Sequence, residues 1–292
     1  MSGSEVDGMS HAKTDASSHA NTDASSRSNA DPMSRSAELA RSDAAPTAPA
    51  RSDATAQATS LFERGYAVFE HLRAPHEVAR LRAALDAERA RLDPPALYAP
   101  ESRPLDDDAF LTTSGLALPR FLPRHPALFP LVLDPRLLAA LRQLLGPLRL
   151  ELAGGMISDP SRPFFRWHTH IDGEDEGERV RRQAWPAQRA PRRVLAILYL
   201  DDLDADGGPL LVHPRRVGDP AAPPHPIDDD DWPGQVELQP RAGTLVALEQ
   251  HTWHAVRRQL RPGPRRFLGC YLAAADAPPA PWAHPDLADA LL

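Results

Sequence analysis

The sequence predicts an α+β protein whose larger layer is an antiparallel sandwich or barrel. Two stretches with apolar residues at helical spacing lie before residue 147, and from residue 148 onward short strand-like segments alternate with Gly- and Pro-containing turns. We expect a jelly roll flanked by N-terminal helices, because that fold leaves a cavity between two sheets that small ligands can enter.

Composition limits the classes of function. The 292 residues carry a net charge of -7, which argues against a general nucleic-acid binder. A single cysteine, Cys270, excludes an internal disulfide and favours a reducing compartment, so we expect a cytoplasmic protein. The chain has no apolar run long enough to span a membrane and no pattern of a signal peptide. It carries no signal for an oligomeric state.

The N-terminal segment, residues 1–57, is rich in Ser, Ala, Asp and Thr and contains short internal repeats. Such a segment cannot bury enough apolar surface to offset the entropy of ordering. We therefore predict a disordered low-complexity tail over 1–57, order beginning near Ser60, and one folded domain over 58–292.

The first ordered elements follow in sequence. Residues 61–69 predict a turn at Gly65 and a short strand, and Pro75 opens a helix with an apolar stripe that ends before Pro94. Residues 93–125 are interpreted as loop, with a solvated acidic turn at 106–108. Asp134 is an expected N-cap for a leucine-rich helix that Gly146 terminates.

Strands dominate the second half of the chain. The expected segments are 148–157, 194–200, 210–213, 236–239, 244–249 and 265–273. Two long loops separate them, at 173–193 and 214–233. The first loop contains an arginine cluster that could recognise an anionic substrate. It also contains Trp185, a candidate lid residue. Trp167 could line a substrate pocket.

One short stretch concentrates metal-binding side chains. In an extended chain His168, His170 and Asp172 project to the same side. Imidazole and carboxylate bind Fe(II), Zn or Mn. His254, after the expected strand 244–249, is the candidate third ligand, so that His170, Asp172 and His254 would form a facial triad with open positions for a cosubstrate and O2. His168 could replace His170 as a ligand, contact the cosubstrate or fill space, and we favour a supporting role.

The cosubstrate is suggested by two arginines. Arg265 and Arg266 begin an apolar strand, and adjacent strand residues face opposite sides, so one of them must point inward. A guanidinium inside a barrel requires an anion, and the distal carboxylate of 2-oxoglutarate meets that requirement. The alternation alone does not distinguish the two arginines.

With these features the chain resembles the phytanoyl-CoA dioxygenase-like family of Fe(II)/2-oxoglutarate-dependent oxygenases. The motifs that carry the resemblance are Leu61 to Phe69, Leu144 to Pro147, His170-x-Asp172, Asp206 to Pro214, and His254 followed by Arg265 and its strand. The resemblance implies a double-stranded β-helix (cupin-like) core and metal ligands His170, Asp172 and His254. It also implies Arg265 rather than Arg266 as the 2-oxoglutarate anchor. The implied reaction couples decarboxylation of 2-oxoglutarate to succinate and CO2 with hydroxylation by O2.

Two other functions stay open at this point. One is a cupin-like metalloenzyme that does not use 2-oxoglutarate, and the other is an inactive binding module on the same fold. In the leading hypothesis, a 2-oxoglutarate-dependent oxygenase, the substrate is a small molecule that could be anionic. The loops 93–125, 173–193 and 214–233 would contact it.

Overall fold

The computed structural model describes residues 51–171, 179–180, 182–185, 190–287 and 290–291, all within one compact unit, residues 48–292. The main helices are α1 (Arg51–Arg64), α2 (Pro75–Leu92), α3 (Phe121–Arg124), α4 (Phe129–Val132) and α5 (Pro135–Leu145). Short 3-10 turns lie at Pro126–Leu128 and Pro285–Leu287. No helix among the described residues has both the length and the apolar character needed to cross a bilayer.

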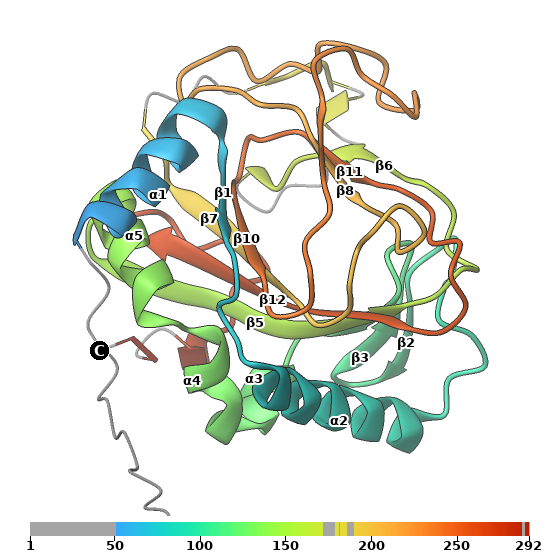
Figure 1. Ribbon diagram of the computed structural model, residues 1–292. Helices are drawn as coiled ribbons and strands as arrows, with labels where there is room; N and C mark the ends of the chain where they lie inside the picture. The colour runs from blue at the N-terminus through green and yellow to red at the C-terminus, as the bar shows by residue number, and fades with distance from the viewer. Residues whose placement is uncertain (1–50, 172–178, 181, 186–189, 288–289, 292) are drawn as a thin grey trace, which may run out of the picture. The chain divides into compact units, whose positions relative to one another are not determined.

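The strands form two antiparallel sheets (Figure 1). The eight-stranded sheet has the order β1-β10-β7-β12-β5-β4-β3-β2, and the four-stranded sheet has the order β6-β11-β8-β9. Their bounds are β1 Tyr66–Phe69, β2 Arg103–Asp106, β3 Ala109–Leu111, β4 Leu116–Leu118, β5 Leu148–Ser158, β6 Phe165–His168, β7 Arg193–Tyr199, β8 Leu210–Val212, β9 Val236–Leu238, β10 Leu245–Glu249, β11 His254–Val256 and β12 Arg265–Ala274. This arrangement confirms the predicted α+β fold with a jelly-roll core.

The larger sheet is buried on both faces, which explains its continuous apolar strands. On β7, Val194, Ala196 and Leu198 belong to the core shared with the helices. Leu195 and Ile197 belong to a second apolar cluster that includes β8 residues of the smaller sheet. Since successive side chains of a strand point to opposite faces, a strand covered on both sides is apolar at every position. The helices therefore cover one face and leave the other to enclose a cavity.

Helix α5 forms as the sequence predicts. The Asp134 carboxylate accepts a hydrogen bond from the Arg136 backbone N–H at 2.7 Å, which satisfies a donor that the first helical turn leaves without a partner. Pro135 occupies the first helical position. Gly146 follows the helix with φ 76°, a conformation that favours glycine.

Two predictions about the N-terminal half are wrong. Residues 51–57 were expected to be disordered, but they form the first turns of α1, which packs against α5. Residues 93–125 were expected to be loop, yet they contain β2, β3, β4 and α3. Strand β4 pairs with β5, and β2 forms the edge of the larger sheet. The acidic turn is present, because residues 107–108 connect β2 to β3. The disordered tail predicted before residue 51 lies outside the described residues and stays a prediction.

Candidate metal and cosubstrate site

A cavity of about 290 Å³ lies between the two sheets. Strands β4, β5, β7 and β12 of the larger sheet and β6, β8 and β11 of the smaller sheet contribute its walls. Most of the lining is apolar. The polar lining side chains are Ser114, Arg162, His168, His170, Tyr199, His254, Arg265 and Tyr271. A mostly apolar cavity with a few convergent polar groups is the usual form of a small-molecule site.

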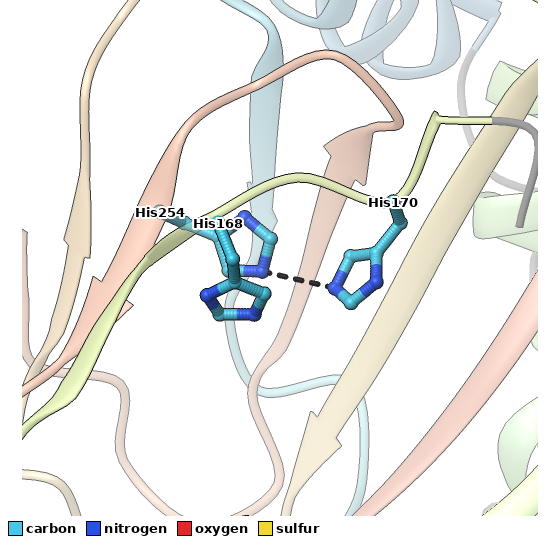
Figure 2. A group of neighbouring side chains, drawn as sticks. All are labelled: His168, His170 and His254. Atoms are coloured by element: carbon cyan, nitrogen blue, oxygen red, sulfur yellow. Dashed lines mark hydrogen bonds between the residues drawn. The ribbon is translucent and has the colours of Figure 1, made fainter. Parts of the chain in front are cut away.

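Three of these side chains converge from the smaller sheet (Figure 2). Antiparallel pairing of β11 with β6 places His254 opposite His168. His170 follows β6, and its backbone N–H donates to the Gln250 carbonyl. The Nε2 atoms of His170 and His254 are 3.1 Å apart, and one nitrogen from each of the three rings lies within 4.8 Å of the others.

The other ring nitrogens of the three histidines already have partners. Nδ1 of His168 lies 2.9 Å from the Arg166 carbonyl, and Nδ1 of His254 lies 2.9 Å from the Thr252 carbonyl. Nδ1 of His170 lies 3.0 Å from the Tyr271 hydroxyl. A carbonyl can only accept, so His168 and His254 carry their protons on Nδ1. When these rings are neutral, the lone pair of each lies on Nε2, and that of His254 faces Nε2 of His170.

Burial keeps the imidazoles neutral. Desolvation lowers the pKa of His254 to about 4. Desolvation, together with the neighbouring histidines, also lowers the pKa values of His168 and His170 well below the usual value. Neutral imidazole is the form that binds metals, so the cluster is in its ligating state at pH 7.

The geometry fits a metal ion. Metal–imidazole bonds are about 2.1 Å long, so two nitrogens at right angles around one ion would be about 3.0 Å apart. The observed Nε2–Nε2 separation of 3.1 Å for His170 and His254 matches that spacing. A facial ligand set requires this right-angle arrangement.

The structure places the other predicted residues of this group as follows. Asp172 lies outside the described residues. His168 and His170 do reach the same site, and the ring of His168 is 4.1 Å from that of His254. Whether His168 is a ligand or a neighbour stays a prediction. His251, three residues before His254, bonds Glu249 and does not line the cavity.

Of the two arginines that begin β12, Arg265 faces the cavity. It is buried, its guanidinium carbon lies 5.8 Å from the centre of the Tyr199 ring, and its Nε has no hydrogen-bond partner. Desolvation lowers its pKa. Arg266 points to the other side and pairs with Asp86 and Asp201. A buried guanidinium with an unused donor that lines a cavity is suited to bind a carboxylate.

Four polar lining residues were not predicted from the sequence: Ser114, Arg162, Tyr199 and Tyr271. Arg162 lies in the connection before β6, and desolvation together with the charge of Arg265 lowers its pKa to about 9. Because Arg162 is in a loop, no periodicity could have indicated it. Tyr271, by contrast, is separated from Arg265 by an even number of strand positions, so alternation along β12 could have predicted that it faces the cavity.

In the described part of the arginine-rich loop, two arginines have partners within the protein, and an anion-binding role for the loop stays a prediction. The buried Arg179 donates to the Ile171 carbonyl. Arg193 forms a buried ion pair with Glu151 at 2.7 Å. The two tryptophans are also not pocket residues: Trp185 contacts Trp253, and Trp167 stacks on Trp232 at 4.2 Å. These aromatic rings form a separate apolar cluster.

Comparison with known proteins supports the fold and the family. The model of the phytanoyl-CoA dioxygenase (PhyH) family matches residues 62–267. No curated protein sequence is similar enough to count as a match.

Several solved structures share the fold. HygX from Streptomyces hygroscopicus, with nickel and 2-oxoglutarate bound, is 19% identical, with 77% of this chain and 88% of that chain covered and a TM-score of 0.54. The α-ketoglutarate-dependent carbocyclase SnoK from nogalamycin biosynthesis is 21% identical, with coverage of 77% and 86% and a TM-score of 0.56. The α-ketoglutarate-dependent epimerase SnoN from the same biosynthesis is 19% identical, with coverage of 82% and 90% and a TM-score of 0.55.

Proposed function

The chain belongs to the phytanoyl-CoA dioxygenase (PhyH) family and is an Fe(II)- and 2-oxoglutarate-dependent oxygenase, and we propose that it hydroxylates a small organic molecule. Family membership selects this function from the three that the sequence leaves open. When bound, iron and 2-oxoglutarate supply the oxidising chemistry: the keto acid is decarboxylated to succinate and CO2 while O2 provides the oxygen of the new hydroxyl group.

The iron ligands in this proposal are His170, Asp172 and His254. The observation that carries it is the 3.1 Å separation of the two Nε2 atoms, which face each other while both Nδ1 atoms have other partners. Asp172 follows His170 by two residues, the spacing at which an extended chain returns to the same side. His168, beside both rings, would contact the end of the cosubstrate nearest the metal.

Arg265 would hold the distal carboxylate of 2-oxoglutarate. Its guanidinium is buried, interacts with the Tyr199 hydroxyl and has a free Nε–H. A charge-assisted hydrogen bond inside an apolar cavity is stronger than the same bond in water, because little solvent competes for the donor. The guanidinium would thereby fix the orientation of the cosubstrate and exclude water from it.

The substrate would be a small, largely apolar molecule. Apart from the eight polar side chains of the cavity, the lining is apolar, including Met156, Ile197 and Phe267. HygX has been crystallised with hygromycin B, and SnoK and SnoN act in nogalamycin biosynthesis, which favours a natural product or a related metabolite. An anionic substrate receives no support from the buried Arg179 and Arg193. The expected cytoplasmic location fits the buried free Cys270.

The test is conversion of 2-oxoglutarate to succinate with Fe(II), ascorbate and a panel of metabolites. We expect one or more panel members to stimulate succinate formation by wild type, and His170→Ala to abolish that stimulation. Arg216→Ala is the matched control, because Arg216 pairs with Glu63 on the surface. Equal succinate from wild type and His170→Ala would contradict the proposed site.

A further inference from the structure

Tyr271 is a partly buried residue of β12 that faces the cavity beside the histidine cluster. We propose that Tyr271 is the positioning residue for His170, holding its ring so that Nε2 points at the metal. This inference rests on the proposed function, because it assigns a role relative to the iron ligand His170.

The three histidines differ in how their Nδ1 atoms are held. His168 bonds the carbonyl of Arg166, and His254 bonds the carbonyl of Thr252, in each case two residues earlier in the same segment. His170 does not use the corresponding carbonyl of its own segment. Its Nδ1 partner is the hydroxyl of Tyr271, on the other sheet and 101 positions away in sequence. The orientation of this one ring therefore depends on a tertiary contact.

The direction of the hydrogen bond follows from the metal site. A neutral imidazole that binds a metal through Nε2 carries its proton on Nδ1. His170 Nδ1–H must then donate, and the Tyr271 hydroxyl oxygen must accept, over the observed 3.0 Å. Such a partner selects the tautomer, orients the ring and increases the electron density available at Nε2. Phenylalanine at this position cannot accept the bond.

The phenol is itself held firmly. Tyr271 pairs with Leu152 on β5 and with Leu195 on β7, so its strand is hydrogen-bonded on both sides. Its ring packs against Trp282, with 4.4 Å between the ring centroids. His170, in contrast, lies just beyond the end of β6. The rigid central strand thus supports the less constrained metal-binding segment across the cavity.

The test compares Tyr271→Phe with Tyr66→Phe. The substitution keeps the ring and its packing and removes only the hydroxyl. Tyr66 is a matched control, because it is a buried strand tyrosine in the same apolar cluster as Tyr271, but its hydroxyl bonds Arg64 and it does not line the cavity. The readouts are anaerobic Fe(II) affinity by chelator competition and the absorption spectrum of the Co(II)-loaded protein.

We expect Tyr271→Phe to bind Fe(II) about 10-fold more weakly, the lower end of the usual effect of losing such a supporting group. We also expect a shift of its Co(II) bands. Tyr66→Phe should match wild type in both. Unchanged affinity and spectrum in Tyr271→Phe would overturn the inference.

His170→Ala and His254→Ala separate this inference from the proposed function. If both lose Fe(II) binding while Tyr271→Phe binds like wild type, the metal site stands and only the role of Tyr271 fails. If His170→Ala binds Fe(II) as tightly as wild type, the proposed site is wrong and the role of Tyr271 falls with it.

Discussion

Replacing Arg265 by methionine removes the buried charge while keeping most of the side-chain length. If this guanidinium holds the distal carboxylate of 2-oxoglutarate, the variant leaves that carboxylate in an apolar cavity without its main partner. Removing one member of a buried, hydrogen-bonded charge pair costs about 3 kcal/mol, which corresponds to a roughly 100-fold increase in the Kd for 2-oxoglutarate. Fe(II) affinity should not change, since Arg265 is not among the clustered metal-binding groups.

The structure also predicts the effect of this substitution on stability. Arg265 is buried with an unsatisfied Nε, and desolvation lowers its pKa, so the charge is unfavourable for folding in the absence of an anion. Arg265→Met should therefore unfold at the same temperature as wild type or higher when no 2-oxoglutarate is present.

The assay is anaerobic calorimetric titration of Fe(II)-loaded protein with 2-oxoglutarate. Arg266→Met is the matched control: its guanidinium pairs with Asp86 and Asp201, so we expect its 2-oxoglutarate Kd to stay within about twofold of wild type. A Kd for Arg265→Met within threefold of wild type would refute the assignment. A large increase for Arg266→Met instead would show that the wrong member of the pair was chosen.

Three further predictions concern the cavity, the histidines and the arginine-rich loop. Gly269 lines the cavity, and a Cβ there would meet only the Leu195 side chain at 3.8 Å. Gly269→Leu should therefore fold normally but lower kcat/KM for the substrate at least about tenfold. A normal kcat/KM would mean that the substrate does not contact the β12 side of the cavity. The pKa of His254 is about 4 in the folded protein and about 6.5 in the unfolded chain, so this group should cost the metal-free protein about 3 kcal/mol of unfolding free energy as the pH falls from 6.5 to 4. The total loss should be larger, because the pKa values of His168 and His170 are also lowered. Urea unfolding with a chelator measures this loss, and His254→Gln should lose less over the same range. Arg193→Met leaves the buried Glu151 with one fewer cation and should lower the unfolding free energy by about 3 kcal/mol. The Kd for 2-oxoglutarate should not change, because Arg193 does not line the cavity. A weaker 2-oxoglutarate complex would instead indicate that Arg193 has an anion-binding role.

Regular patterns in the sequence predicted the site well where the side chains lie on strands. Alternation along the chain placed His168 and His170 on one side, and it required one of Arg265 and Arg266 to face inward. The structure brings the two histidines to His254 and turns Arg265 into the cavity. Such predictions succeed because the period of a strand is fixed by its backbone.

The failures have physical causes of a different kind. The N-terminal turns of α1 contain few large apolar residues, and their helix depends on packing against α5, which local composition does not reveal. The strands β2, β3 and β4 are three or four residues long and lie among Pro, Asp and Gly, so their pairing depends on contact with β5. Arg162 reaches the cavity from a loop, whose path follows no period.

The most direct test of the central claim is anomalous diffraction at the iron edge from crystals grown anaerobically with Fe(II). We predict one strong peak about 2.1 Å from Nε2 of both His170 and His254. The same map identifies the third ligand, for which we predict the Asp172 carboxylate rather than His168. A peak elsewhere, or no peak between these two imidazoles, would contradict the proposed iron site.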